Sequence, residues 1–259
     1  MSRAFYATIA RYYDSEHHDK DEDLPLYLEL AAAAGRERPA LILGSGTGRL
    51  ALELAAAGLA VHGVEIEPAM LERAQRKLAA RPDLAERVTF HAGDALTLEL
   101  PAGCGLVLIP YNTLMHFLTL DDQRALLRRA RAALAPGGLL VIDLPNAGEA
   151  FAAQDTEALI LERTFLDQET GRQVMQQSVS RLDRAAQKMF VTWIYDAIGA
   201  DGMVERTVAP VVIHYYFYSE LRLLLELCGL RITAVYGDFD RTPFEDGSPR
   251  LIVIAAAAD

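Results

Sequence analysis

Cysteine is scarce in this chain, and long apolar runs are missing. Its 259 residues include only two cysteines, Cys104 and Cys228, which are too few for a disulfide framework and lack the spacing of metal ligands. Both lie among apolar residues, so we expect small buried side chains and no metal site. No stretch reaches the roughly 20 apolar residues that span a bilayer, and the first residues lack the apolar segment of a signal peptide. We therefore expect a cytoplasmic protein that does not enter membranes.

Positive charge is also in short supply. The chain has 25 Lys and Arg residues against 36 Asp and Glu residues, a formal net charge of −11 at pH 7. Proteins that bind nucleic acids usually present a basic face, because phosphate contacts supply most of their affinity. The densest basic run, Arg124, Arg128, Arg129 and Arg131, alternates with Ala and Leu at helical spacing and is better explained as the solvated side of a helix. We expect no nucleic-acid partner.

Hydrophobic residues make up 51% of the chain, enough for a substantial core. Over residues 36–150, short apolar runs that predict buried strands alternate with amphipathic patterns that predict helices. The predicted strands are 40–43, 60–65, 88–91, 105–110 and 139–144. The last helix of the region, capped by Thr119 and Asp122, is expected to bury Leu126, Leu127, Ala130 and Leu134 and to end at Pro136. This order predicts a mainly parallel sheet with helices on both faces.

A different pattern begins after residue 150. Apolar and polar residues alternate over four segments separated by turn signals, which predicts an antiparallel β meander at 160–167, 173–183, 188–198 and 204–217. A helix from Ser219 to Cys228 and two further strands, 230–236 and 251–256, complete the chain. The predicted fold is therefore α/β, with a seven-stranded mostly parallel sheet and an inserted antiparallel meander.

Three glycines stand at every second position between the first predicted strand and the helix that follows it. In Gly44-Ser45-Gly46-Thr47-Gly48 they let the backbone turn tightly and approach a ligand closely. The next helix offers free N–H groups and the positive end of its dipole. Such a loop suits a nucleotide or an adenosyl compound, although a left-handed turn without a ligand would use the same residues.

Two carboxylates follow later strands. Glu65 ends the second strand, 21 residues after Gly44, where an acid accepts hydrogen bonds from both ribose hydroxyls in folds of this kind. Asp94 lies just beyond the third strand, where it could accept a hydrogen bond from an adenine amino group. The alternatives are a surface carboxylate for Glu65 and a helix N-cap for Asp94. Glu65 is favoured as a ligand because it accompanies the glycine loop.

These motifs resemble those of the class I methyltransferases that use S-adenosylmethionine. The run from Leu41 to Gly48 is similar to their first motif, the segment from Gly63 to Leu71 to their second, and Gly93-Asp94-Ala95 to their third. The turn from Leu134 to Leu139 is similar to the one before their fifth strand, and the four motifs occur in the family's order. Ser45 departs from the pattern, since the family often has Cys or Ala there.

The resemblance implies a Rossmann-like fold and the cofactor S-adenosylmethionine, with S-adenosylhomocysteine as product. The residues it implies for cofactor binding are Gly44, Ser45, Gly46, Gly48, Glu65, Ile66, Met70, Gly93, Asp94, Ala95, Pro110 and Tyr13. It also implies one methyltransferase domain over 1–259, with a helical cover at 1–35, a cofactor-binding core at 36–150, a lid formed by the meander at 155–218, and a closing helix and strand pair at 219–259.

Candidates for catalysis lie after the fourth strand, because ligands bind at the carboxyl ends of the strands in such sheets. Asn112 could hydrogen-bond the substrate or cofactor there, and His116 could act as a base or bind the substrate. The alternative for His116 is a histidine satisfied by the backbone. By analogy with the family, Tyr6 and Tyr13 are expected to close over the site, Tyr6 as a substrate contact and Tyr13 as a cofactor or catalytic contact.

An aromatic cluster at the end of the meander supplies the remaining substrate candidates. Strand alternation would place His214 and Tyr216 on one face, with Tyr215 and Phe217 on the other. The face with His214 and Tyr216 could line a substrate pocket, and packing within the sheet is the alternative.

The expected function is transfer of a methyl group from S-adenosylmethionine to an N or O atom of a small-molecule acceptor. Two alternatives remain. A nicotinamide-dependent oxidoreductase shares the glycine loop and the ribose acid, but it usually has Gly-x-Gly-x-x-Gly and leaves Asp94 unexplained. An S-adenosylmethionine-binding protein without catalysis would carry the same motifs. A homodimer is also left open, because an exposed meander edge could pair with another copy.

Overall fold

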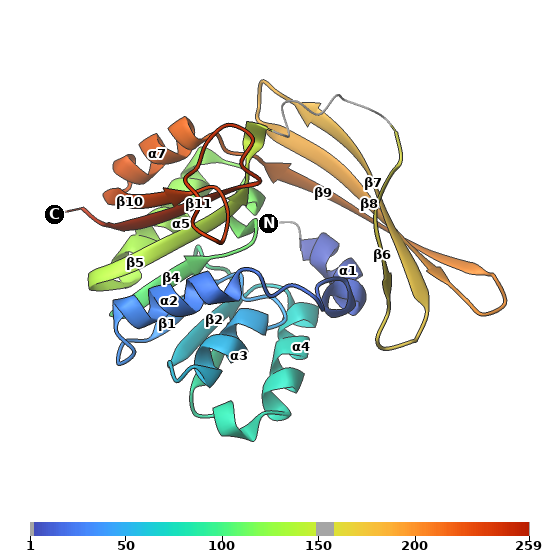
Figure 1. Cartoon of the computed structure of the whole chain (residues 1–259), viewed down its shortest axis with the longest axis horizontal. Coiled ribbons are helices and arrows are strands. Elements are labelled where there is room, and N and C mark those ends of the chain that lie inside the picture. The colour runs from blue at the N-terminus through green and yellow to red at the C-terminus, as the bar shows by residue number, and fades with distance from the viewer. Residues whose placement is uncertain (1–2, 149–157, 259) are drawn as a thin grey trace.

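The computed structural model describes residues 3–148 and 158–258. Its main element is a seven-stranded sheet with the order β10-β11-β5-β4-β1-β2-β3 (Figure 1). The strands are β1 (Ala40–Leu43), β2 (Val61–Glu65), β3 (Val88–Ala92), β4 (Cys104–Ile109), β5 (Leu134–Pro145), β10 (Leu230–Tyr236) and β11 (Arg250–Ala257). The predicted seven-stranded sheet is confirmed.

Strand direction locates the ligand-binding edge of this sheet. Strands β3, β2, β1, β4 and β5 are parallel to one another, whereas β11 is antiparallel to both β5 and β10. The chain runs outward from β1 to β2 and β3, and then returns to place β4 on the other side of β1. In doubly wound sheets, ligands bind at the carboxyl ends of the strands where this reversal occurs.

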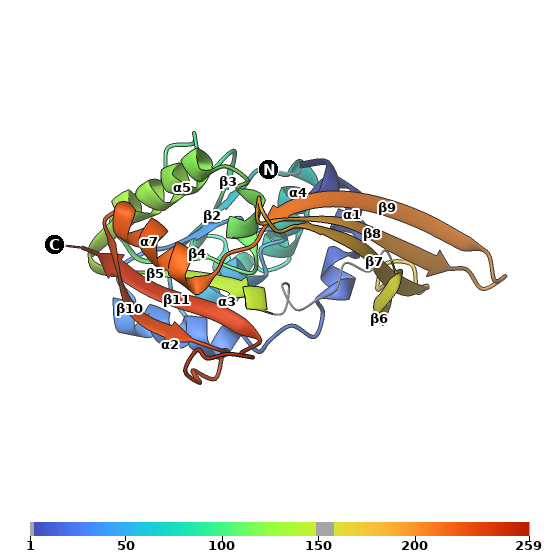
Figure 2. The same cartoon turned by 90° about the horizontal axis from the view of Figure 1, so that it is seen from above.

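Helices cover both faces of the sheet (Figure 2). Side chains alternate along β1, so Ala40 and Ile42 pack in one cluster with α2 and α3, whereas Leu41 and Leu43 pack in another with α5 and α7. The α-helices of the core are α2 (Leu24–Ala34), α3 (Arg49–Ala56), α4 (Pro68–Ala79), α5 (Leu120–Ala133) and α7 (Tyr218–Leu227), and the short 3₁₀ helices are η1 (Pro82–Leu84) and η2 (Thr113–His116). No helix within the described ranges is long and apolar enough to cross a membrane.

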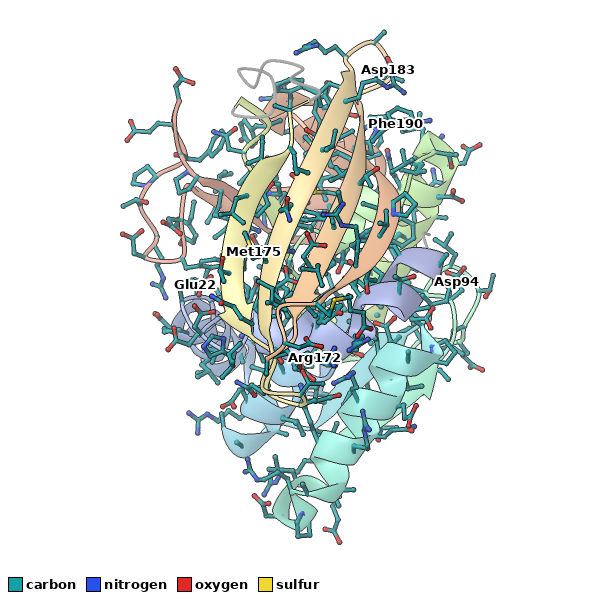
Figure 3. The ribbon with its side chains drawn as sticks, turned by 90° about the vertical axis from the view of Figure 1, so that its right-hand side faces the viewer. Glu22, Asp94, Arg172, Met175, Asp183 and Phe190 are labelled. Carbon is teal, nitrogen blue, oxygen red and sulfur yellow. The ribbon has the colours of Figure 1, made fainter. Side chains whose placement is uncertain are left out.

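The meander forms a second, four-stranded sheet beside the main one. Its strands are antiparallel in the order β6 (Ile160–Leu166), β7 (Gln173–Asp183), β8 (Lys188–Ile198) and β9 (Val204–His214). Figure 3 looks onto these strands, with Arg172 at the end near α4 and Asp183 at the opposite end. The sequence therefore predicted this sheet correctly.

The N-terminal helix α1 (Arg3–Glu16) lies between the core and the meander (Figure 1). Its apolar side chains Phe5, Ile9 and Tyr12 pack against the meander in a third hydrophobic cluster that includes Val191 and Tyr195. The Tyr12 and Tyr195 rings are stacked, with centroids 5.0 Å apart. Residues 17–23 separate α1 from α2, and both helices lie within the range 1–35 that was expected to be helical.

Three predicted boundaries are wrong. The fifth strand begins at Leu134 and not at residue 139. Helix α5 ends at Ala133, and Leu134 starts β5 in an extended conformation instead of completing the buried helical stripe. The steric effect of proline explains this, since a residue before proline avoids the helical region and Ala135 precedes Pro136. Strand β9 ends at His214, three residues early, because the chain turns there to begin α7 at Tyr218. The expected start of the lid at residue 155 lies outside the described residues.

Candidate active site

The glycine-rich turn connects β1 to α3 at the ligand-binding edge. The amides of Gly44 and Ser45 both donate to the carbonyl oxygen of Val64 at 2.9 Å, which fixes the turn to β2. Gly44 has a φ of 76°, and a Cβ atom there would lie 2.7 Å from the Thr113 side chain. A side chain at this position would meet both backbone strain and a collision, so only glycine allows this approach.

Glu65 ends β2 directly beside this turn. Its side chain is buried and accepts hydrogen bonds from the amides of Gly46 (2.8 Å), Ile66 (3.0 Å) and Glu67 (2.8 Å). Burial raises the pKa of Glu65 above its ordinary value, although the three amides favour the charged form. The carboxylate is therefore held in a fixed position with lone pairs left for further hydrogen bonds.

A cavity of about 380 Å³ opens at this edge of the sheet. Twelve of the predicted site residues line it: Tyr6, Tyr13, Gly44, Ser45, Gly46, Glu65, Ile66, Met70, Gly93, Ala95, Pro110 and His116. The predicted residues that do not line it are Gly48, Asp94, Asn112, His214 and Tyr216. The fold thus brings together residues from α1, the glycine turn and the ends of three strands.

Gly48 and Asp94 have local structural roles next to the cavity. Gly48 is the N-cap of α3 and has a left-handed φ of 82°. The Asp94 carboxylate accepts a hydrogen bond from the amide of Leu96 at 2.9 Å, in a turn that does not continue as a helix. The neighbours Gly93 and Ala95 face the cavity, so an adenine contact by Asp94 stays a prediction.

His116 and Tyr6 form a polar pair in the wall of the cavity. The Tyr6 hydroxyl lies 2.8 Å from Nε2 of His116, and the imidazole is only 6% exposed. Burial lowers the pKa of His116 to about 4 and raises the pKa of the Tyr6 phenol above its usual value. Both side chains are therefore uncharged near neutral pH. Nδ1 of His116 has no hydrogen-bond partner among the residues that the structure describes.

Tyr13 lies two helical turns beyond Tyr6 on the side of α1 that faces the cavity. Its ring is 6.4 Å from the Tyr6 ring and stacks on His17 at 4.4 Å. His17 also hydrogen-bonds the Tyr13 carbonyl through Nδ1 at 2.8 Å. Tyr6 and Tyr13 of α1, together with His17, therefore line the cavity.

His214 and Tyr216 contact each other but lie outside the cavity. Their ring centroids are 4.6 Å apart. Nε2 of His214 lies 3.2 Å from the Glu220 carboxylate, and the Tyr216 hydroxyl donates to the Leu114 carbonyl at 3.2 Å. Their described contacts join the end of β9 to α7 and η2, and the substrate role predicted for them has no geometric support here.

The cavity is also lined by a second group of polar residues, and the sequence had not indicated these residues. Asp14 accepts hydrogen bonds from the Thr47 hydroxyl (2.6 Å) and the Lys77 ammonium (2.5 Å), joining α1 to the glycine turn and α4. Lys77 follows Met70 by two helical turns, a spacing that could have identified it. The other polar lining residues that were not named individually as site residues are His17, His18, Lys20, Arg49, Tyr111, Thr113 and Gln168.

The sheet order, the glycine turn and the buried acid at the end of β2 define a doubly wound α/β protein that binds a nucleoside-like ligand. Residues 40–138 match the family model described as "Methyltransferase domain". This region therefore carries a methyltransferase domain, as its motifs predicted, and the solved structures with the same fold include S-adenosylmethionine-dependent methyltransferases.

Similarity to known proteins extends over most of the chain. The cypemycin N-terminal methyltransferase of a Streptomyces species is 25% identical over 217 residues, which cover 84% of this chain and 82% of that protein. The CcbJ methyltransferase of Streptomyces caelestis has a TM-score of 0.81 at 26% identity and covers 100% of both chains. CalS10, an amino pentose methyltransferase of Micromonospora echinaspora solved with S-adenosylmethionine, has a TM-score of 0.70 at 22% identity over 94% of each chain. The similarity therefore includes α1 and the meander.

Proposed function

We propose that this chain methylates an amine nitrogen of a small-molecule acceptor, with S-adenosylmethionine bound across residues 44–48, 65–70 and 93–95. When bound, this cofactor supplies a methyl group activated on a sulfonium. The acceptor would lie between residues 110–116, α1 and the meander. The division into cover, core and lid at 1–35, 36–150 and 155–218 is part of the same proposal.

The lining residues suit an adenosyl group. Ser45 lines the cavity between Gly44 and Gly46 in the glycine turn. Gly46 faces open space, since a Cβ atom there would find nothing nearer than Met70 Cε at 3.8 Å. Glu65 retains lone pairs for ribose hydroxyls beside this space. Together they offer polar contacts next to an apolar surface for the adenine.

The buried pair of His116 and Tyr6 carries the preference for nitrogen over oxygen. A hydroxyl acceptor must lose its proton as it attacks, and this requires a base of suitable strength. The pKa of His116 is lowered to about 4, so its neutral imidazole is a weak base, and Tyr6 stays protonated. An amine can enter the cavity already neutral, with its lone pair free. The pair is then suited to orient the amine by hydrogen bonding and to exclude water.

The similar proteins support the same choice of acceptor. One is an N-terminal methyltransferase, and another acts on an amino pentose. Their acceptors differ in size, so they support the amine group and leave the rest of the acceptor open.

Thermal unfolding with added ligands tests the cofactor. A ligand at roughly 100 times its dissociation constant stabilises the native state by about 2.7 kcal/mol. We expect S-adenosylmethionine and S-adenosylhomocysteine to raise the unfolding midpoint, and NAD and NADP to leave it unchanged. A rise with NAD or NADP alone would favour the oxidoreductase and overturn the proposal.

Replacement of Glu65 tests the site. We expect Glu65→Ala to weaken S-adenosylmethionine binding by about 1–3 kcal/mol in calorimetry, because the ribose hydroxyls lose their acceptor. Glu72→Ala, on the exposed side of α4, is the matched control and should bind as the parent does. Equal affinity of parent and Glu65→Ala would place the cofactor elsewhere.

Acceptor screening tests the reaction. We expect S-adenosylhomocysteine release with amines, at a rate that rises with pH as the amine loses its proton, and little release with matched alcohols. Release with alcohols alone would refute the nitrogen preference. Binding without release for any acceptor class would favour the non-catalytic alternative.

A further inference from the structure

Two consecutive residues after β4 have backbone conformations that non-glycine residues rarely adopt. Tyr111 has a φ of 42° and Asn112 a φ of 64°. Each such conformation costs on the order of 1–3 kcal/mol and persists only where the surroundings enforce it. Tyr111 lines the cavity, so the strain lies at the candidate active site.

A fully buried carboxylate holds this turn. Asp143, on β5, has 0% exposure and accepts hydrogen bonds from the Tyr111 amide (3.2 Å) and the Tyr27 hydroxyl (3.3 Å). The Asn112 amide donates to the Asp143 carbonyl at 3.1 Å. A buried carboxylate is costly unless its charge is paired.

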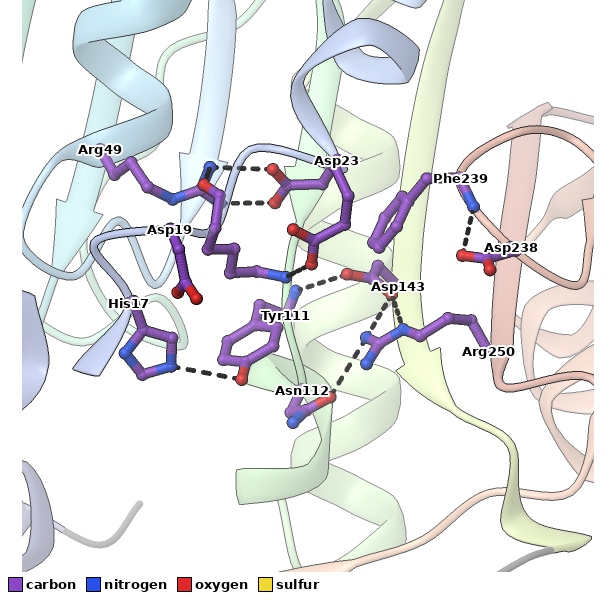
Figure 4. A network of polar contacts seen from close by, with 12 residues as sticks. His17, Asp19, Asp23, Arg49, Tyr111, Asn112, Asp143, Asp238, Phe239 and Arg250 are labelled. Atoms are coloured by element: carbon purple, nitrogen blue, oxygen red, sulfur yellow. Dashed lines mark hydrogen bonds and ion pairs between the residues drawn. The ribbon is translucent and has the colours of Figure 1, made fainter. Parts of the chain in front are cut away.

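Arg250, at the start of β11, supplies that pairing (Figure 4). Its Nε donates to Asp143 Oδ1 at 2.9 Å, and its Nη2 donates to the same carboxylate and to Asn112 Oδ1. We call Asp143 and Arg250 the clamp. The clamp contacts both strained residues, one through its amide and the other through its side chain.

Tyr111 extends from the clamp to the segment between α1 and α2. Its hydroxyl lies 3.2 Å from Nε2 of His17, and the Lys20 ammonium lies 4.3 Å from its ring centroid (Figure 4). His17 in turn stacks on Tyr13, which lines the cavity. A chain of contacts therefore runs from β11 through Tyr111 to the cover of the cavity.

A second cleft, of about 320 Å³, lies on the other side of the same residues. It is lined by Arg250 and Phe239 and shares His17, Lys20 and Tyr111 with the main cavity. Tyr111 therefore contributes to the boundary of both spaces.

We propose that Arg250 is a positioning residue for methyl transfer, which acts through Asp143 and the left-handed Tyr111–Asn112 turn to hold His17, Lys20 and Tyr13 over the cofactor. The effect on cofactor affinity rests on the proposed function, whereas the effect on the order of the cover does not.

Hydrogen exchange of the full-length protein, with the free energy of unfolding measured in parallel, is the first test. Arg250→Met leaves Asp143 unpaired, so the double variant Asp143→Asn/Arg250→Met, which buries no unpaired charge, is made alongside it. We expect amide exchange at residues 13–20 and 111–113 to accelerate about tenfold in both variants, while amides of β1 keep the parental rate. Arg250→Lys keeps the charge without the planar fork and should give an intermediate result.

Two further variants separate positioning from general destabilisation. Arg241→Met is the matched control, because Arg241 precedes β11 in the same loop and pairs with Glu29 on α2. It should exchange as the parent does. Tyr111→Phe keeps the clamp but loses the hydrogen bond to His17, so exchange should rise at residues 13–20 and stay parental at 111–113.

Cofactor binding supplies the second readout. We expect the dissociation constant and KM for S-adenosylmethionine to rise about tenfold in the double variant, with a smaller change in kcat. Parental exchange at 13–20 together with parental affinity in the double variant would overturn the proposal. A parent that fails to bind S-adenosylmethionine would refute the proposed function instead, and the exchange data would still decide the role of Arg250.

Discussion

At the scale of single residues, His116 links the cavity to the acid sensitivity of the protein. Its pKa is lowered by burial from the ordinary 6.5 to about 4 in the folded state. As the pH falls below 6.5, the unfolded chain binds this proton first, which favours unfolding. Stability from the neutral imidazole is therefore present above pH 6.5 and lost progressively as the pH falls to about 4.

We expect His116→Gln to remove this contribution. Between pH 6.5 and pH 4 the free energy of unfolding of the parent should fall by about 3 kcal/mol more than that of the variant, since each pKa unit corresponds to about 1.4 kcal/mol. Urea unfolding at several pH values measures the difference. Parallel pH profiles for parent and His116→Gln would contradict the burial argument.

Residues that belong to local motifs could be predicted, and residues that act through distant partners could not. The glycine turn and Glu65 lie within one βαβ unit, so spacing alone identified them. The pair of His116 and Tyr6 joins positions 110 residues apart, and the sequence indicated each candidate without their contact. The contact of Asp14 with Lys77, which joins α1 to α4, was missed because the two residues are 63 positions apart in the sequence.

At the scale of elements, the β6–β7 turn, residues 167–171, fastens the meander to the core. Arg73 on α4 forms an ion pair with Glu169 of this turn at 2.6 Å and lies 3.6 Å from Asp14 on α1. The amide of Gln168 donates to Ser15 Oγ at 3.0 Å, and Gln168 lines the cavity. The turn is thus held against both α1 and α4 at the edge of the cavity.

We expect Glu169→Ala to accelerate dissociation of S-adenosylmethionine about threefold, because release of the turn opens that edge and most effects of contact loss appear in the off-rate. Stopped-flow displacement measures the rate. The unfolding midpoint should hardly change, since an ion pair with a side chain 53% exposed contributes at most about 1 kcal/mol. Arg172→Ala removes a neighbouring pair, with Glu205, that does not reach α4, and should release the cofactor at the parental rate. An unchanged dissociation rate in Glu169→Ala would show that the turn does not control release of the cofactor.

Strand and helix cores were predictable because their periods of 2 and 3.6 residues are clear in this sequence. The ends of the strands and helices depend on local steric and tertiary effects. The end of α5 is set by the steric effect of Pro136 on Ala135, and the end of β9 by the geometry that α7 requires, which no period records. How far α1 packs on the meander also depends on tertiary contacts.

At the scale of the whole molecule, the charge distribution argues against polyanionic partners. The net charge is −11, and part of the basic run on α5 is engaged within the protein. Nε of Arg129 donates to the Ala95 carbonyl at 2.7 Å, and Nε of Arg131 to the Gly229 carbonyl at 2.8 Å. The basic side of α5, which was predicted to face solvent, therefore partly contacts other segments of the protein.

We expect no binding of a fluorescent DNA duplex in anisotropy measurements at about 150 mM salt, where a Debye length of about 8 Å screens weak attraction. The same titration at low salt, where charges are screened less, tests whether a local basic patch binds DNA weakly. Saturable binding at about 150 mM salt, with an affinity that falls steeply as salt increases, would contradict this expectation.

The packing of α1 on the meander has a consequence for how the protein is made. Helix α1 leaves the ribosome before the meander, but the surface that covers Phe5, Ile9 and Tyr12 comes from residues 165–211. At usual rates of synthesis this helix waits on the order of ten seconds for its partner. The last strand, β11, must still insert between β10 and β5 to finish the sheet. A nascent chain can therefore complete its glycine turn early, yet it completes the sheet beside the cavity only after β11 has been made.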